Sequence, residues 1–232
     1  MGTEALPSAR STTKSDVAEP EPASGPIKLM ILPRTLTGLG RAGLRRHLAT
    51  VYGPMVMAEP AVSSGFRGYI HHYAIACPVQ PALEDRDAVT FIRFDTLADM
   101  IASKASNAYR ERIGPDEDNF REIEGSVAMF AQERVIASGA DDAPRKLFVF
   151  RTGSCDDLDQ CAAALSAISV VPGVQGVITN LTQVIEGQWS FGRIDEIGLE
   201  HDADIPTLAT ALLALGTAGE AGFLLTEPLR FI

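Results

Sequence analysis

The sequence is poor in basic residues relative to acidic ones. It has 20 Lys and Arg against 30 Asp and Glu over 232 residues, so its formal net charge at pH 7 is −10. A protein that binds nucleic acid normally presents a concentrated basic patch, and the sequence contains none. We therefore expect no nucleic-acid partner.

Cysteine and histidine are also scarce. The chain has three cysteines, four histidines and no CxxC pair, which favours neither a disulfide framework nor a zinc site. We expect Cys77, Cys155 and Cys161 to be inert thiols. His71 and His72 are adjacent, and adjacent side chains of a strand point to opposite faces, so this pair does not chelate one ion. No phosphate loop, nucleophile elbow or dinucleotide fingerprint is present, and we expect no metal or other cofactor.

Long apolar runs are missing as well. No uninterrupted run reaches the roughly 18 residues that suggest a membrane span, and the first residues lack the charged-then-apolar order of a secretory signal. We therefore expect a soluble, cytoplasmic protein without membrane contact. With 46% hydrophobic residues, the chain is long enough for one large or two small domains with an ample core.

Segments with strand and helix patterns alternate along the rest of the chain. Residues 1–26 mix Pro, Ser, Thr, Glu and Ala with few large apolar side chains, which predicts a disordered tail. A first unit, 27–137, reads as strand, helix, strand, strand, helix, strand. The predicted elements are strands at 27–33, 66–76, 88–94 and 126–136, a helix at 37–51 that ends at Gly53-Pro54, and a helix capped by Asp95-Thr96.

The second half repeats this order after a short linker. Residues 138–144 are small, acidic and turn-forming, and a second unit, 145–232, follows them. Its expected elements are strands at 146–151, 176–184, 192–199 and 223–232 and helices at 156–168 and 205–215. The βαββαβ order is the ferredoxin-like arrangement, in which both helices cover one face of an antiparallel sheet. We therefore predict an α+β chain of two tandem ferredoxin-like units.

Several segments of the first unit also resemble a known family. They are 27–30, Leu44-Arg-Arg-His-Leu-Ala-Thr-Val-Tyr-Gly-Pro54, Gly68-Tyr-Ile-His-His-Tyr73, Phe94-Asp-Thr-Leu97 and the run from Ala108 to Phe120. Together they are similar to the EthD domain of the dimeric α/β-barrel superfamily, over residues 27 to about 136. Residues 145–232 resemble a degenerate second copy.

This resemblance implies a fold and a range of activities. In that superfamily two ferredoxin-like units pack sheet against sheet into a barrel, and the sheets enclose the ligand cavity. With both units in one chain the barrel can close within the chain, and we expect a monomer or homodimer. The family implies cofactor-free chemistry on hydrophobic, often aromatic or polyketide-like molecules, by cyclases, dehydratases, lactone isomerases, lyases and quinone-forming monooxygenases. Some members have no assigned activity.

The chain departs from the family pattern at three positions. Tyr52 stands where members often have a histidine before the Gly-Pro step, and Tyr73 stands where they often have another late in the second strand. Phe91 occupies a position that often carries a carboxylate. The family's usual histidine pair and third-strand carboxylate base are therefore not expected here.

The second strand supplies the candidate catalytic residues. Strand alternation places Tyr69, His71 and Tyr73 on one face, and His72 with two apolar neighbours on the other. The apolar neighbours suit the helix layer, so we expect the first face to line the barrel interior, with Tyr52 reaching the same cavity. A neutral imidazole can accept a proton, and phenols can donate to a developing oxyanion. The alternative is a satisfied polar strand face or a dimer contact.

Four further residues are candidates for substrate binding. Arg93 can bind a carboxylate or phenolate of the substrate, or form a structural ion pair with Asp116 or Glu117. The acidic residues 116–118 otherwise suit a solvated helix face. Tyr109 and Trp189 can form aromatic walls for a flat substrate or belong to the ordinary core. His47 lies on a basic helix face, in the site or exposed.

These residues lead to one functional hypothesis and two alternatives. We predict a cofactor-independent lyase that eliminates water or a small carbonyl fragment from a hydrophobic aromatic or phenolic molecule, or performs the related cyclisation. The alternatives are a cofactor-free quinone-forming monooxygenase and a non-catalytic small-molecule binding or accessory protein. Either enzyme would belong to aromatic compound metabolism.

Overall fold

The computed structural model describes residues 26–152, 158–215 and 221–232. The predicted tail at 1–26 lies almost wholly outside these residues. The strands of the first unit are β1 (Ile27–Thr35), β2 (Phe66–Ala74), β3 (Ala88–Phe94) and β4 (Arg121–Ala137), and those of the second are β5 (Arg145–Arg151), β6 (Val174–Glu186), β7 (Arg193–Leu199) and β8 (Ala221–Arg230).

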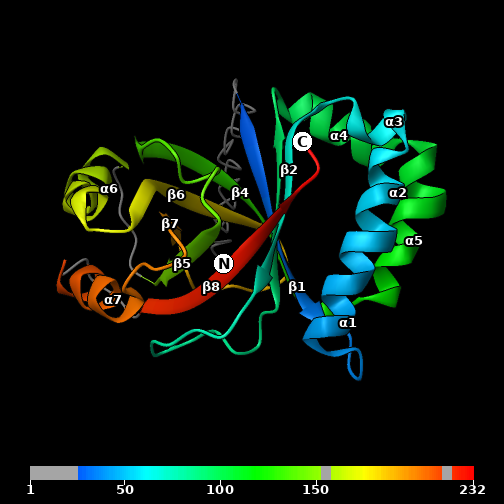
Figure 1. The fold of residues 1–232 in the computed structure, drawn as a ribbon. Coiled ribbons are helices and arrows are strands. Elements are labelled where there is room, and N and C mark those ends of the chain that lie inside the picture. Colours follow the sequence, from blue (N-terminus) through cyan, green and yellow to red (C-terminus); the bar gives the residue numbers. More distant parts are fainter. Residues whose placement is uncertain (1–25, 153–157, 216–220) are drawn as a thin grey trace, which may run out of the picture.

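The eight strands close into one antiparallel barrel (Figure 1). Its order is β1-β3-β2-β8-β5-β7-β6-β4. Each unit contributes the same internal order, β4-β1-β3-β2 and β8-β5-β7-β6, so the fourth strand of each unit pairs with the second strand of the other. The prediction of two ferredoxin-like units that form a barrel within one chain is confirmed.

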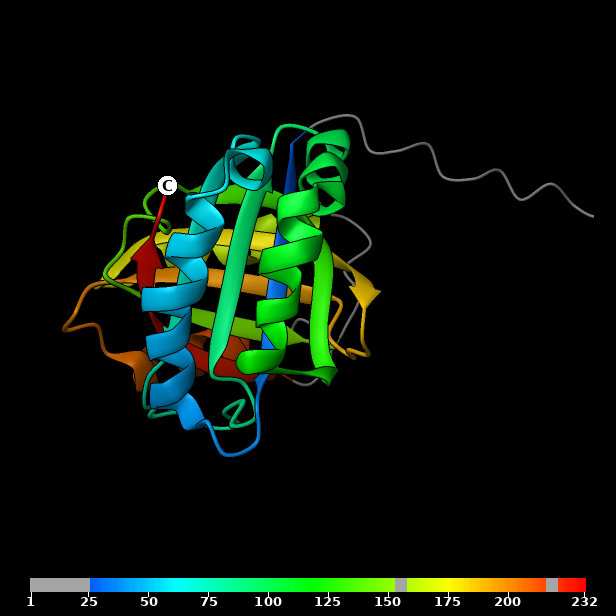
Figure 2. The ribbon, with the colours of Figure 1, turned by 90° about the vertical axis from the view of Figure 1, so that its right-hand side faces the viewer.

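Helices cover the outside of the barrel on two opposite sides, as Figures 1 and 2 show. The first unit carries α1 (Gly40–His47), η1 (Leu48–Tyr52), α2 (Gly53–Met57), α3 (Pro60–Ser63), α4 (Leu97–Ala105), η2 (Tyr109–Ile113), α5 (Gly114–Asp116) and η3 (Glu117–Asn119). The second unit carries α6 (Leu158–Leu165), η4 (Ser166–Val170) and α7 (Ile205–Ala214). The predicted Thr96 cap of α4 is present, because its side chain accepts from Asp99 N–H.

The Gly53-Pro54 step does not end the first helix, contrary to expectation. The backbone of Gly53 stays helical and its N–H donates to Leu48 O, which makes η1 a π-helical turn. Pro54 then falls in the first turn of α2, where a missing N–H is tolerated. The π-helical segment η2 likewise leads into a Gly-Pro step, at Gly114.

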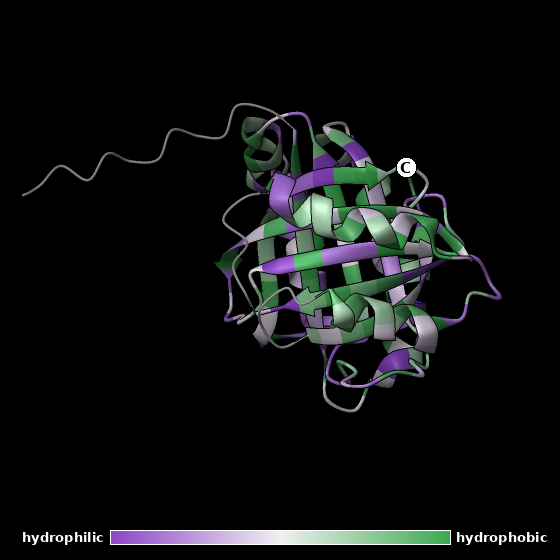
Figure 3. Ribbon diagram, turned by 90° about the vertical axis from the view of Figure 1, so that its left-hand side faces the viewer, coloured by the Kyte–Doolittle hydropathy of each residue, from purple (hydrophilic) through white to green (hydrophobic). Residues whose placement is uncertain are grey.

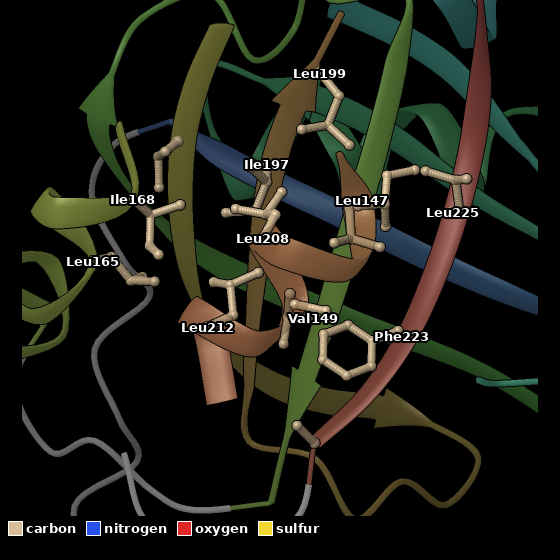
Figure 4. Packing of buried hydrophobic residues seen from close by; sticks show 14 residues of the cluster. Leu147, Val149, Leu165, Ile168, Ile197, Leu199, Leu208, Leu212, Phe223 and Leu225 are labelled. Carbon is tan, nitrogen blue, oxygen red and sulfur yellow. The ribbon is translucent and has the colours of Figure 1, made fainter. Parts of the chain in front are cut away.

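Three apolar layers hold these elements together. One fills the barrel interior, with Met30, Phe91, Met129 and Phe148 among its members. A second packs the sheet of the second unit against α6 and α7, and Figure 4 shows its leucine and isoleucine side chains meeting between them. Figure 3 views the molecule from this side, with hydrophobic and hydrophilic residues mixed along the strands. A third layer lies between the first sheet and its helices.

The barrel interior also contains a buried ionic cluster between the two units. Glu196, with no exposed surface, accepts from Lys146 Nζ at 2.7 Å and from Lys28 Nζ. Lys28 also contacts Glu133 at 2.7 Å, and Lys146 contacts Asp141 at 2.9 Å. These ion pairs connect β1 and β4 of the first unit with β5 and β7 of the second.

The cysteines differ from expectation in one respect. Cys161 is disulfide-bonded rather than a thiol, whereas Cys77 is a free cysteine. Cys155 lies outside the described residues. Within those residues, no helix has both the length and the apolar character needed to cross a membrane.

Candidate functional site

An apolar cavity of about 50 Å³ lies between the first sheet and the helices that cover it. We call it the sheet–helix pocket. Its apolar walls include Leu29, Ile92 and Phe94 from the strands and Val56, Met100 and Ile113 from the helices. A cavity of this size has room for about one or two water molecules, each of which takes about 30 Å³ in the liquid.

Two buried polar groups in this pocket lack protein partners. Tyr69 and His71 both line it from β2, and their rings lie 4.8 Å apart. His71 Nδ1 is 2.7 Å from Thr90 Oγ1, but His71 Nε2 and Tyr69 Oη have no hydrogen-bond partner within the described part of the chain. An unsatisfied buried polar group costs about 1–3 kcal/mol. A bound molecule with matching polar atoms would remove that cost.

Burial determines the protonation states of both groups. It lowers the pKa of His71 to about 3, because the imidazolium would lose its hydration. It raises the pKa of Tyr69 well above its usual value, because the phenolate would be equally poorly solvated. At neutral pH the pocket therefore holds a neutral imidazole beside a protonated phenol.

A carboxylate with two phenol donors occupies another part of the same pocket. Tyr52 Oη and Tyr109 Oη donate to Glu117 Oε1 at 2.9 and 2.7 Å. Arg121 Nε donates to Glu117 Oε2 at 2.9 Å, and Arg121 Nη1 contacts Glu186 Oε1 at 3.2 Å. Burial, reinforced by the Glu117 charge, raises the pKa of both tyrosines. They therefore remain protonated donors.

Glu117, Thr90 and Arg121 are site residues that the sequence analysis missed. The acidic residues 116–118 were expected on a solvated helix face, yet Glu117 is only 12% exposed and lines the pocket. The sequence carries no signal that identifies Glu117. Gly-Pro steps follow Tyr52 directly and Tyr109 five residues later, but neither step indicates a shared carboxylate.

The structure brings together four of the eight predicted site residues: Tyr52, Tyr69, His71 and Tyr109 all line the pocket. Tyr73 does not. It shares a β2 face with His71, but it packs beneath α1 with the Arg45 guanidinium 5.2 Å from its ring.

His47, Arg93 and Trp189 also lie outside the pocket lining. His47 Nε2 is 2.7 Å from Asp116 Oδ2. Arg93 pairs internally, but with Glu133 and Asp141, each at 2.9 Å, and not with Asp116 or Glu117. Trp189 packs in the aromatic layer of the barrel, and the Arg86 guanidinium lies 5.2 Å from its ring.

The predicted orientation of β2 is reversed. Tyr69 and His71 share a face as expected, but this face meets the helices, and the pocket is not enclosed by the two sheets. His72 points into the barrel, 4.9 Å from the Phe91 ring and 5.2 Å from the Phe148 ring. The reason is that almost all of β2 is buried on both faces. Apolar neighbours therefore did not distinguish the helix side from the barrel side.

No group of three His, Cys, Asp or Glu side chains that could hold a metal ion occurs within 26–152, 158–215 and 221–232. In the second unit, the layer equivalent to the pocket is filled by Leu147, Val149, Ile197, Leu208 and Leu212 (Figure 4). The two units thus share a fold, but the pocket described above belongs to the first.

Comparison with known proteins supports the family resemblance and the fold. Residues 36–124, within the first unit, match the EthD domain, and the match ends before the second unit. No curated protein sequence matches the chain.

Solved structures share the fold at low sequence identity. An anthrone oxidase-like protein is 12% identical, with a TM-score of 0.58, over 89% of this chain and 92% of that one. A "putative monooxygenase" from Fusobacterium nucleatum is 9% identical, with a TM-score of 0.54, over 89% and 93%. A "putative chlorite dismutase" is 13% identical, with a TM-score of 0.52, over 88% and 95%. These likenesses show the dimeric α/β-barrel fold.

Proposed function

We propose that this chain, whose residues 36–124 are similar to the EthD domain, processes a hydrophobic phenolic molecule in the sheet–helix pocket by proton transfer. The observation that carries the proposal is the pair of buried, unpartnered polar atoms, Tyr69 Oη and His71 Nε2, in an otherwise apolar cavity. Tyr69 Oη can donate a hydrogen bond to a substrate oxygen, and His71 Nε2 places an imidazole nitrogen beside it.

The reaction that uses these groups most directly is a cofactor-independent elimination of water. His71 Nε2 removes a proton from the carbon next to a substrate carbonyl, and Tyr69 Oη donates a proton to the departing hydroxyl. The carbon–oxygen bond breaks, water leaves, and proton transfer from the imidazolium to the phenolate restores both residues. The pKa of His71 is about 3, so its ring is a weak base. It takes the proton from the substrate carbon only as negative charge develops beside the ring and stabilises the imidazolium.

Glu117 gives the pocket a preference for hydroxyl groups. Its Oε1 accepts from two phenols, Tyr52 and Tyr109, so a substrate hydroxyl can take the place of either donor and keep that oxygen hydrogen-bonded, while the displaced phenol needs a new acceptor. An aromatic ring is larger than the cavity of about 50 Å³. Binding would therefore move the helices away from the sheet. Because one chain supplies the whole barrel, we propose that the protein works as a monomer or homodimer.

A cofactor-free monooxygenase is the second candidate, favoured by the names of the anthrone oxidase-like and monooxygenase neighbours. In that reaction one molecule of O₂ converts a substrate CH₂ group to a carbonyl and leaves as water. The same pocket groups would assist by removing the acidic CH proton. Oxygen uptake separates this reaction from elimination.

The test is turnover of two probes, a phenolic β-hydroxy ketone and anthrone, followed by mass spectrometry and an oxygen electrode. Loss of water without oxygen uptake supports elimination. His71→Gln and Tyr69→Phe are expected to lower the rate by roughly 10²–10⁴-fold. His72→Gln is the matched control, because the neighbouring histidine faces the barrel and should affect folding stability instead.

Two results would contradict this assignment. Oxygen uptake that accompanies quinone formation would favour the monooxygenase. Tight binding of the phenolic probe without conversion would favour the non-catalytic binding protein.

A further inference from the structure

Phe231 connects the second unit to the pocket of the first. β8 ends at Arg230, and the chain continues beside β2, as Figure 1 shows near the C label. Phe231 N–H donates to Tyr69 O at 2.9 Å, and Tyr69 N–H donates to Ile232 O at 3.4 Å. These bonds fix the Phe231 backbone opposite a residue of the pocket.

The Phe231 ring contacts both unpartnered polar residues. It stacks on Tyr69 with ring centroids 5.0 Å apart and an interplanar angle of 28°. It meets His71 edge to face, at 5.4 Å and 86°. Aromatic pairs at such separations contribute beyond the area they bury, and both geometries restrict ring rotation. One phenylalanine therefore limits the orientation of the Tyr69 phenol and the His71 imidazole together.

Gly53 provides the space that this ring needs. A Cβ atom at position 53 would lie 2.2 Å from Phe231 Cζ and 2.7 Å from Cε1. No real Cβ tolerates such distances, so any side chain there would displace the ring. Gly53 directly follows Tyr52, whose phenol binds Glu117, so the ring packs against the backbone that carries a third phenol of the pocket.

We infer that Phe231 is a positioning residue for the sheet–helix pocket, and that the second unit contributes to the site through it. In the second unit, the equivalent layer between sheet and helices is filled with apolar side chains. The second unit therefore contributes Phe231 to the pocket of the first unit and does not form an equivalent pocket of its own. This inference rests on the proposed role of Tyr69 and His71. Its direct consequence, the fixed orientation of two rings, can be measured without turnover.

The experiment compares Phe231→Leu and Phe231→Tyr with the wild-type protein. Phe231→Leu retains apolar bulk but loses the aromatic ring, so the Tyr69 ring should flip faster. The readout is the flip rate, because removal of the Phe231 ring current shifts nearby NMR resonances by itself. Phe231→Tyr restores the ring and should restore the wild-type flip rate of Tyr69. Where turnover is measurable, Phe231→Leu should lower kcat by roughly 10- to 100-fold, as misplaced reacting groups do.

The matched control is Phe191→Leu. Phe191 is also a half-buried phenylalanine next to the second unit's strands, but it packs on Phe150 and Trp189. A wild-type flip rate of Tyr69 in Phe231→Leu, or an equal acceleration in Phe191→Leu, would overturn the inference. Absence of turnover in the wild-type protein would refute the proposed function and leave the NMR comparison intact.

Discussion

His71 and His72 are neighbours in sequence but are buried in different parts of the molecule. His71 faces the pocket beneath the helices, and His72 lies between phenylalanine rings inside the barrel. Burial lowers the pKa of both, and the Lys146 charge lowers that of His72 further. Both rings are therefore neutral in the folded protein at pH values where an unfolded chain would protonate them.

This difference predicts acid sensitivity. An unfolded histidine has a pKa near 6.5, and folded His71 has a pKa of about 3, so the unfolded chain binds more protons between these values. The free energy of unfolding should therefore fall as pH decreases from 6.5 toward 3. His71→Gln should reduce this dependence by about 1.4 kcal/mol per pH unit. Urea unfolding at pH 4–8 measures it, with exposed His201→Gln as the control; an unchanged slope in His71→Gln would refute the prediction.

At the scale of elements, the two π-helical segments meet at one carboxylate. η1 supplies Tyr52 and η2 supplies Tyr109, and both phenols bind Glu117 Oε1. π-helical turns often mark functional sites, and here they bring two tyrosines from different helices to the same atom. The carboxylate thus connects the two helical walls of the pocket.

This arrangement predicts coupled losses of stability. A hydrogen bond to a charged group contributes about 1.5–3 kcal/mol, so Tyr52→Phe and Tyr109→Phe should each destabilise the fold by about that amount or slightly less. The double variant should lose more than the sum, because each single variant leaves Glu117 Oε1 with one phenol donor. Chemical denaturation of the double-mutant cycle measures the coupling.

Tyr73→Phe is the control for this cycle. The Tyr73 hydroxyl is buried and has no hydrogen-bond partner in the described part of the chain, so its removal should be neutral or stabilising. Strict additivity of the Tyr52 and Tyr109 variants would show that the two phenols do not share their acceptor.

At the scale of the whole molecule, buried charges connect the two units inside the barrel. Glu196 lies in β7 and accepts from Lys146 in β5 and from Lys28 in β1. The two ammonium groups hold the pKa of the Glu196 carboxyl well below its usual range, against the opposing effect of burial. The carboxylate therefore remains charged and balances two cations that have little access to water.

Glu196→Gln should destabilise the whole barrel. It leaves the two buried lysines with Glu133 and Asp141, both partly exposed, as their carboxylate partners, and with Asn180 Oδ1 at 3.4 Å from Lys28 Nζ. Breaking a buried ion pair costs about 3–5 kcal/mol. Thermal and urea unfolding should show this loss in one cooperative transition, because the strands of both units form a single closed sheet. The exposed Glu124→Gln is the control, and equal stability of the two variants would contradict the assignment.

The sequence by itself determined the order of elements and their local geometry. Alternation of apolar residues, turn-forming segments and the Thr96 cap act over a few residues, so they indicated the βαββαβ repeat and the shared face of Tyr69 and His71. These features do not depend on which distant segment packs on top. The EthD resemblance added the barrel that joins the two units.

Only the tertiary structure decided which face of β2 lines the pocket and which residues meet there. Alternation separates the two faces of a strand but does not identify what covers each, and here both faces are buried. Tyr52 and Glu117 are 65 residues apart, and Phe231 reaches Tyr69 from the other unit. Barrel closure brings these distant segments together. The residue pattern of each segment does not indicate which other segment it will meet, so the sequence alone could not predict these contacts.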